Sequence, residues 1–240
     1  MTREQFLVNE CDKIGVQLSE QQVKQFIRFY ELLVEWNSFM NLTGITEYEE
    51  VVVKHFVDSL AIIKSIDLKK DSLKIIDMGT GAGFPGLPLK IAYPNIDMVL
   101  ADSLNKRVKF LNEVIKQLDL KNIKAVHGRA ETLGRNLEYR EKFDYCVSRA
   151  VANMAVLSEY CIPFVKIGGS FVPYKAGAVE EELNDAKHAI FLLGGRVKEC
   201  KYFNLPDTDI QRAIITIDKV QSTNKKYPRS EGKPAKEPLN

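Results

Sequence analysis

The feature that most constrains the fold of this chain is a glycine-rich turn directly after a short apolar run. The run covers residues 73–77, and the turn continues from Asp77 as Met-Gly-Thr-Gly-Ala-Gly-Phe-Pro-Gly. A short apolar run that stops at glycines is typical of a buried parallel strand. Glycines let the backbone turn sharply and approach a ligand closely, because no Cβ is in the way. The sequence therefore predicts a strand, a ligand-binding turn and a helix in succession.

Strands and helices alternate through the rest of the chain. Six further apolar runs are expected strands, at 97–101, 123–126, 143–147, 170–174, 197–203 and 212–217. Helical spacing of apolar residues marks the segments 105–118, 151–160 and 180–193. This pattern predicts an α/β fold: a mostly parallel seven-stranded sheet with helices on both faces, in which the last two strands form an antiparallel closing pair.

The chain divides into three parts. Residues 1–65 read as an N-terminal helical segment, in which Ser19 with Gln22 and Thr46 with Glu49 have the spacing of capping boxes. Residues 66–220 contain the alternating elements. Residues 221–240 mix prolines with charges and are expected to order only by docking.

Composition excludes several classes of protein. The net charge is only +2 over 240 residues, so the chain as a whole is not a polycation, although the C-terminal tail is basic. Four cysteines without a CxxC pair and only three histidines argue against a metal site. With no secretory signal and no apolar run of membrane-spanning length, we expect a cytoplasmic protein, with a monomer as the simplest oligomeric state.

The turn leaves two ligand classes open. Gly81, Gly83 and Gly86 spell the G-x-G-x-x-G pattern of dinucleotide-binding proteins. Two details favour S-adenosylmethionine instead. The carboxylate of Asp77 can meet the ammonium of a bound amino acid, which a dinucleotide lacks. The bulk of Phe84 stands where a dinucleotide-binding helix would present a bare N-terminus to a pyrophosphate.

Two more candidate residues lie at the carboxyl ends of expected strands, as the glycine turn does. Asp102 ends the second expected strand, where a carboxylate can accept hydrogen bonds from ribose hydroxyls. Arg149 follows the fourth strand at its carboxyl end, where open α/β sheets bind ligands. We therefore expect Arg149 to be the catalytic residue; the alternative is a surface arginine paired with Glu131 or Asp144.

Four segments carry a family resemblance. They read DMGTGAGFPGLPLKI from residue 77, LADSLNKRVKFL from residue 100, GRAE at 128–131 and SRAVA at 148–152. They resemble the class I, Rossmann-like S-adenosylmethionine-dependent methyltransferases, and more narrowly the small-subunit ribosomal RNA methyltransferase G family, also called glucose-inhibited division protein B. The likeness covers nearly the whole chain and makes residues 66–220 the cofactor-binding domain. One departure is Lys175-Ala176, where the family more often has Lys-Gly.

The resemblance implies methyl transfer from S-adenosylmethionine to N7 of a guanine in 16S ribosomal RNA. Carried over by position, Gly79 and Phe84 line the methionine end, Asp102 binds the ribose, and Arg149 lies where cofactor meets substrate. The expected cofactor site comprises Asp77, Gly79, Gly81, Gly83, Phe84, Asp102, Ser103, Ala130, Glu131 and Arg149. Three groups of basic residues are candidate RNA contacts: Lys106, Arg107 and Lys109; Lys54 and Lys64; and the basic residues from Lys219 to the C-terminus. The last group, with Tyr227 beside Arg229, is the better candidate.

The chemistry agrees with this expectation. Guanine N7 has a lone pair and no proton, so its methylation needs positioning rather than a general base. Ser148-Arg149-Ala150-Val151 replaces the Asn/Asp-Pro-Pro-aromatic motif of amine methylation, and none of the cysteines follows a proline as in carbon-5 methylation.

Other interpretations stay open. His55 and Asp58 are expected to pack on the core or touch RNA rather than catalyse, and Trp36 to anchor the core. A non-catalytic RNA-binding assembly factor is the second hypothesis. A nicotinamide-dependent reductase is the third, although its Tyr-x-x-x-Lys pair is absent after the fourth strand.

Overall fold

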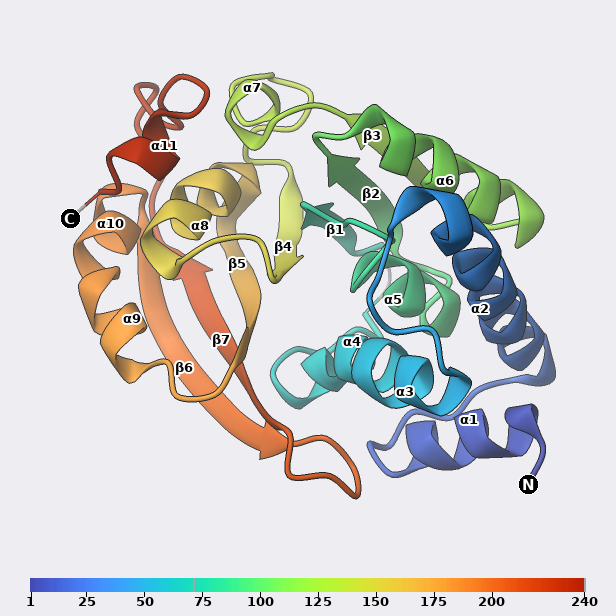
Figure 1. Cartoon of the computed structure of the whole chain (residues 1–240). Coiled ribbons are helices and arrows are strands. Elements are labelled where there is room, and N and C mark those ends of the chain that lie inside the picture. The colour runs from blue at the N-terminus through green and yellow to red at the C-terminus, as the bar shows by residue number, and fades with distance from the viewer. Residues whose placement is uncertain (71, 240) are drawn as a thin grey trace.

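A single twisted sheet forms the centre of the molecule in the computed structural model, which describes residues 1–70 and 72–239 (Figure 1). Its strand order over the described residues is β3-β2-β1-β4-β5-β7-β6. The strands are β1 (Lys74–Met78), β2 (Asp97–Asp102), β3 (Ile123–His127), β4 (Phe143–Arg149), β5 (Val165–Ala176), β6 (Gly195–Asn204) and β7 (Gln211–Lys219). The strands β1 to β5 pair in parallel, and β7 is antiparallel to both β5 and β6. The predicted mostly parallel sheet with an antiparallel closing pair is confirmed.

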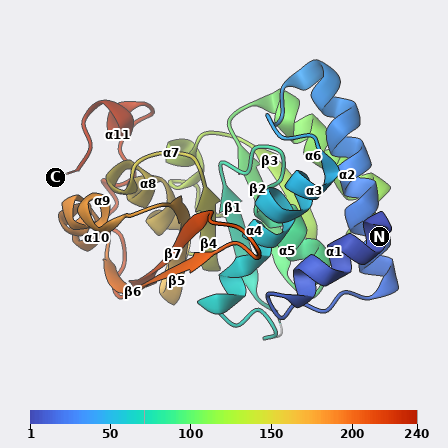
Figure 2. The ribbon, with the colours of Figure 1, turned by 60° about the horizontal axis from the view of Figure 1, so that its bottom comes forward.

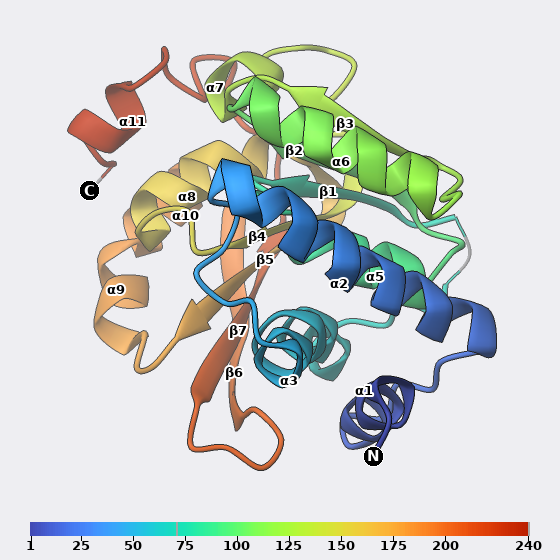
Figure 3. The same cartoon turned by 45° about the vertical axis from the view of Figure 1, so that its right-hand side comes forward.

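Helices cover both faces of the sheet. One face carries α1 (Arg3–Asp12), α2 (Glu20–Met40), α5 (Gly86–Ala92) and α6 (Asn105–Gln117), and α2 crosses α5 beside α6 (Figure 3). The other face carries α7 (Ala130–Leu133), α8 (Met154–Cys161), α9 (Glu180–Asp185) and α10 (Lys187–Leu192). Successive strand residues point to opposite faces, so Ile75 joins the first apolar cluster and Ile76 the second.

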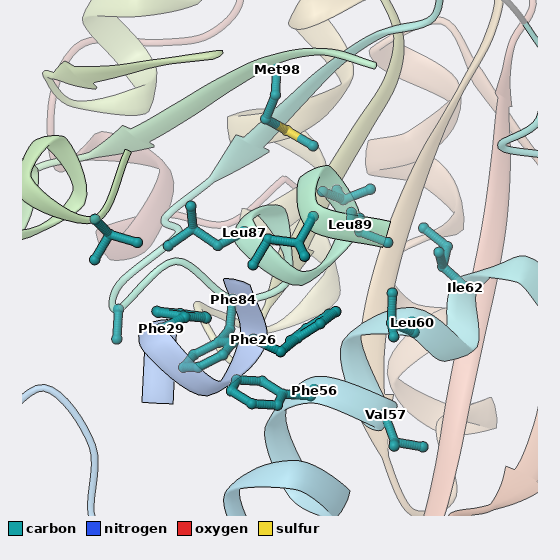
Figure 4. Packing of buried hydrophobic residues seen from close by; sticks show 14 of the residues in the cluster. Phe26, Phe29, Phe56, Val57, Leu60, Ile62, Phe84, Leu87, Leu89 and Met98 are labelled. Carbon is teal, nitrogen blue, oxygen red and sulfur yellow. The ribbon is translucent and has the colours of Figure 1, made fainter. Parts of the chain in front are cut away.

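The N-terminal helices pack directly against the glycine turn. Phe26 and Phe29 of α2 meet Phe56, and the ring centroids of Phe29 and Phe84 lie 5.3 Å apart (Figure 4). Phe84 belongs to the glycine turn, and the rings of Phe26, Phe29 and Phe56 are fully buried. The helical segment therefore supports the turn from one side and is part of the same core.

Of the two capping boxes predicted for this segment, one forms and the other does not. The box of Ser19 and Gln22 forms at the start of α2, which runs to Met40. The box of Thr46 and Glu49 is wrong: α3 (Tyr48–Val51) starts after Glu47 without a side-chain cap. The Thr46 carbonyl instead accepts a hydrogen bond from the Tyr30 hydroxyl. The chain continues as a π-helix, η1 (Val52–Val57), then α4 (Asp58–Leu60) and a 3-10 turn, η2 (Ala61–Lys64).

Several expected elements differ in extent. The helix predicted over 151–160 begins only at Met154. The single helix predicted over 180–193 is divided by a turn at Ala186 into α9, which has no buried residue, and α10, which packs Ala189 and Ile190 into the core. The strand predicted at 170–174 extends over the whole of β5. A short 3-10 turn, η3 (Ile162–Phe164), leads from α8 into β5.

The C-terminal residues dock on the body of the molecule. They include α11 (Lys233–Lys236), which lies beside α8, on the side away from α1 and α2 (Figure 2).

The departure from the family pattern at Lys175-Ala176 lies in a regular strand, because Ala176 pairs with Arg212 between β5 and β7. Among the described residues, no helix combines the length and hydrophobicity needed to cross a bilayer.

Candidate functional site

The glycine turn is held against the end of β2. The backbone amides of Gly79 and Thr80 both donate to the carbonyl of Ala101, over 2.9 and 3.1 Å. The amide of Gly81 donates to Oδ2 of Asp102 over 2.9 Å. The pairing of β1 with β2 thus brings the glycine turn next to Asp102, the residue that is expected to bind the ribose.

Asp77 lies beneath this turn and is fully buried. Its Oδ2 accepts hydrogen bonds from Thr80 Oγ1 (2.6 Å) and from the amide of Gly86 (2.8 Å), at the start of α5. Its Oδ1 is buried and has no hydrogen-bond partner among the described residues. Burial raises the pKa of the Asp77 carboxyl to about 7. Asp77 therefore holds the turn to its helix and retains one unused acceptor.

A cavity of about 160 Å³ opens at the carboxyl ends of β1 and β2, and we call it the glycine-turn cavity. Its lining residues are Met78, Gly79, Asp102, Ser103, Gly128, Arg129, Ala130, Glu131, Val151 and Tyr160. Gly79, Asp102, Ser103, Ala130 and Glu131 come from three separate stretches of sequence, and the fold brings them to this one cavity. Asp77, Gly81, Gly83 and Phe84 stand behind the lining rather than in it.

Arg149 faces a second cavity of about 340 Å³, the arginine cavity. This cavity is lined by Ile45, Lys54, His55, Asp58, Arg149, Ala150, Tyr174, Lys175, Ala176 and Arg212. The Nη1 atom of Arg149 lies 3.1 Å from Oδ2 of Asp58, and its guanidinium stacks over the ring of Phe84 at 5.1 Å. The alternative partners Glu131 and Asp144 are wrong: Glu131 contacts the tail and Asp144 pairs with Lys166.

Asp58 is the site residue that sequence reasoning undervalued. Its other oxygen, Oδ1, lies 3.1 Å from Nε of Arg212, so one buried carboxylate joins two arginines. The three residues lie on α4, β4 and β7, and Asp58 precedes its partners by 91 and 154 residues. No local sequence pattern predicts such a pairing, because only the folded sheet brings this helix and these two strands together.

His55 is neutral in this arrangement. Its ring stacks on Phe84, with centroids 4.6 Å apart, and Nε2 lies 2.8 Å from Thr43 Oγ1. Burial and the nearby Arg149 lower the pKa of His55 to about 4. The expectation that His55 packs on the core rather than exchanging protons fits both its burial and its pKa.

A thin wall separates the two cavities. Arg149 and Ala150 line the arginine cavity, and the next residue, Val151, lines the glycine-turn cavity. Ala150 adopts a left-handed backbone with φ +57°, which turns the chain from one cavity to the other. Nζ of Lys175 donates to the carbonyl of Ala152 over 2.9 Å and fixes the far end of the wall.

Three of the expected RNA-contacting residues are not free. Lys219 belongs to β7, is 2% exposed and pairs with Glu141. Tyr227 is buried, and Arg229 pairs with Glu159. Trp36 packs on Phe110, with ring centroids 5.6 Å apart, as a core anchor would.

Comparison with known proteins agrees with this geometry. Residues 22–232 match the family model described as GidB, rRNA small subunit methyltransferase G. The ribosomal RNA small subunit methyltransferase G of Lachnoclostridium phytofermentans is 59% identical over 226 residues, covering 94% of this chain and 93% of the relative. That of Alkaliphilus metalliredigens is 48% identical over 239 residues and covers all of both chains.

Solved structures with low sequence identity share the fold. TrmN from Thermus thermophilus has a TM-score of 0.54 at 14% identity, covering 69% of this chain and 49% of its own. TYW2 of M. jannaschii in complex with AdoMet has a TM-score of 0.51 at 14% identity, covering 63% of this chain and 71% of its own. The predicted class I methyltransferase fold is thereby confirmed. Because the family model spans most of the sequence and the relatives align over nearly their full length, the chain belongs to the ribosomal RNA small subunit methyltransferase G family.

Proposed function

We propose that the protein transfers the methyl group of S-adenosylmethionine to N7 of a guanine in 16S ribosomal RNA. Family membership makes the chain an S-adenosylmethionine-dependent methyltransferase of small-subunit ribosomal RNA. The target nitrogen and the role of each residue are our proposal. We also propose that it works in the cytoplasm, where its RNA substrate is found.

The glycine-turn cavity fits the cofactor. When bound, S-adenosylmethionine supplies a methyl group on a positively charged sulfur. Asp102 already accepts hydrogen bonds from the amides of Gly81 and Leu104 and, over 3.4 Å, from Nη1 of Arg107. A carboxylate has about four acceptor positions, so it can still bind a ribose hydroxyl. Asp77 stands behind this lining, and we propose that it supports the cofactor site by holding the glycine turn to α5. Ala130 and Glu131 border the adenine.

The arginine cavity fits the target base. Its cations, Lys54, Arg149, Lys175 and Arg212, suit an anionic RNA backbone and the oxygen of guanine. The observation that carries the proposal is the lack of a free base among the described residues lining this cavity. Asp58 is shared by two arginines, and burial raises the pKa of Tyr174 well above its usual value. Both ring nitrogens of His55 have partners, in Thr43 and Arg149, and its pKa of about 4 makes it a weak base. A nucleophile with no proton to lose, such as guanine N7, is the one that this lining serves.

Arg149 contributes from the wall between the two cavities. Its guanidinium is held by Asp58 on one side and by the Phe84 ring on another, so it offers its remaining donors in a fixed direction. We propose that it orients the guanine beside the methyl donor, which makes it the catalytic residue in the sense of positioning the reacting atoms.

The test is methylation with labelled cofactor. Small-subunit particles and free 16S RNA are incubated with the protein, and the label is mapped by mass spectrometry. We expect N7-methylguanine at one position, and we expect Arg149→Ala to reduce the rate at least about tenfold. Label on another atom would reject the N7 assignment. RNA binding that is independent of the cofactor and leaves no label would favour the assembly-factor hypothesis.

A further inference from the structure

Residues 227–232 form a strap that ends at the rim of the glycine-turn cavity. The strap is anchored by Arg229, whose Nη2 lies 2.7 Å from Oε2 of Glu159 and whose amide donates to Oε1 over 2.7 Å. Glu159 is fully buried in α8, and Tyr227 is 5% exposed. Nε of Arg135 donates to the Pro228 carbonyl over 2.9 Å. The strap is thus fixed on the body at a point outside the cavity.

Beyond this anchor, the strap contacts the turn at 128–133. The amide of Gly232 donates to Oε1 of Glu131 over 2.9 Å. The carboxylate of Glu231 accepts a hydrogen bond from Thr132 Oγ1 (2.5 Å) and lies 3.3 Å from Nε of Arg129. Three residues of the turn are therefore tied to two residues of the strap, and two of the three, Arg129 and Glu131, also line the cavity.

The turn needs such external support. It contains α7, a helix of four residues whose N-cap, Arg129, makes no side-chain capping bond. A helix this short has little stability of its own, because the cost of nucleation is not recovered within one turn. The amide of Gly232 acts on this segment at Glu131, and the carboxylate of Glu231 acts at Arg129 and Thr132; Arg129 and Glu131 line the cavity.

We propose that the strap positions the adenine side of the cofactor site, with Glu231 as a positioning residue. The inference rests on the proposed function, since it assumes that residues 128–131 border the cofactor. Glu231 and Arg129 are both more than half exposed, so their ion pair adds little to global stability and acts locally. Loss of the contacts of Glu231 and Gly232, with the Arg229 anchor kept, therefore weakens cofactor binding without unfolding the protein.

This role is separable from RNA binding by the tail. The exposed cations Lys233 and Lys236 follow the strap and make none of these contacts. A tail that serves only RNA needs those lysines, whereas the strap needs Glu231 and the backbone of Gly232. The two roles therefore respond to different substitutions.

The test is calorimetric titration of the full-length protein with S-adenosylmethionine. Glu231→Ala should raise the Kd about three- to tenfold, the range of one or two lost hydrogen bonds. Glu231→Gln, which keeps an acceptor for Thr132, should recover part of the loss. Glu237→Ala is the matched control, because that carboxylate pairs with Lys233 of the tail, and it should change the Kd less than twofold. In methylation assays, Glu231→Ala should raise the KM for the cofactor and leave kcat nearly unchanged.

Two truncated chains complete the design. A chain ending at Ser230 keeps the Arg229 anchor and loses Glu231 and Gly232, and its cofactor affinity should fall further than in Glu231→Ala. A chain ending at Lys236 should bind like the full protein, as should the double variant Lys233→Ala/Lys236→Ala. Thermal unfolding of each variant checks that the fold is retained.

The outcomes distinguish this inference from the function that it assumes. If the chain ending at Ser230 binds the cofactor as tightly as the full protein, the strap inference is overturned, and a weaker, less salt-dependent RNA affinity in that chain would assign the tail to RNA alone. If Lys233→Ala/Lys236→Ala weakens cofactor binding equally, charge and not the strap is responsible. If the unaltered protein does not bind S-adenosylmethionine, the proposed function itself fails.

Discussion

At the residue scale, Asp58 and Asp77 are two buried carboxylates in opposite surroundings. Asp58 has a guanidinium on each oxygen, so its charge is compensated where it is buried. Asp77 has a hydroxyl and an amide on one oxygen and no partner on the other. Burial without a cation raises the pKa of Asp77 to about 7. The charged form of Asp77 therefore destabilises the fold.

This contrast predicts a pH-dependent effect of Asp77→Asn. The folded-state pKa lies above the unfolded value of 3.8, so the unfolded chain loses its proton first as the pH rises. The free energy of unfolding of the parent therefore falls between about pH 4 and pH 7, and the asparagine variant escapes that loss. The gain from Asp77→Asn should be larger at pH 8 than at pH 5 by about 2–3 kcal/mol. Urea unfolding at both pH values measures it, and an equal difference at both would contradict the raised pKa.

At the element scale, two glycines of the turn are required for different reasons: both have a left-handed backbone, but only one leaves no room for a side chain. Gly79 and Gly81 both have positive φ, at +73° and +61°. A Cβ on Gly79 would come within 2.6 Å of Cγ2 of Val151, whereas a Cβ on Gly81 would meet nothing within 4 Å. Only the substitution of Gly79 would displace Val151, which lines the glycine-turn cavity.

Gly79→Ala and Gly81→Ala should therefore differ in activity more than in stability. Each should lose about 1–2 kcal/mol, the cost of a left-handed backbone with a side chain. Gly79→Ala should in addition weaken cofactor binding about tenfold or more, because the displaced Val151 enters the cavity. Titration with S-adenosylmethionine and urea unfolding of both variants measure the two effects. Equal cofactor affinity in the two variants would show that Val151 moves aside without cost.

The elements also show what a sequence can reveal. The strands, the glycine turn and the Ser19 capping box follow from local patterns of apolar residues and caps, and each was predictable. The π-helix of residues 52–57 was not predictable, because its sequence does not differ from that of an ordinary α-helix. The Asp58 pairing and the strap depend on contacts between distant segments, which the strand order creates and no local spacing records.

At the scale of the whole molecule, the N-terminal segment is not a separate body. One apolar cluster runs from Leu7 through the glycine turn to Ile214 of β7. Polar contacts cross the same boundary: the hydroxyl of Tyr174 donates to the Ser59 carbonyl over 2.6 Å, and Lys201 donates to the Lys64 carbonyl over 2.5 Å. The division expected at residue 65 marks a change of pattern within one core.

We therefore predict a single cooperative unfolding transition. Residues 1–65 and 66–220 share buried surface, so neither part can unfold without exposing the core of the other. Scanning calorimetry should give one peak whose calorimetric and van't Hoff enthalpies agree. Two resolved transitions, or an enthalpy ratio well above one, would show that the helical segment unfolds independently.

The wall at residues 149–151 has a consequence for inhibitor design. A compound with an adenosine-like group in the glycine-turn cavity and a second ring in the arginine cavity would have to cross only this short stretch of backbone. The first group would meet the glycine turn and Asp102, at the carboxyl ends of the central strands. The second would meet a chamber built partly by the N-terminal helices, through Lys54, His55 and Asp58. Selectivity among methyltransferases should therefore come from the half of the compound that imitates the substrate.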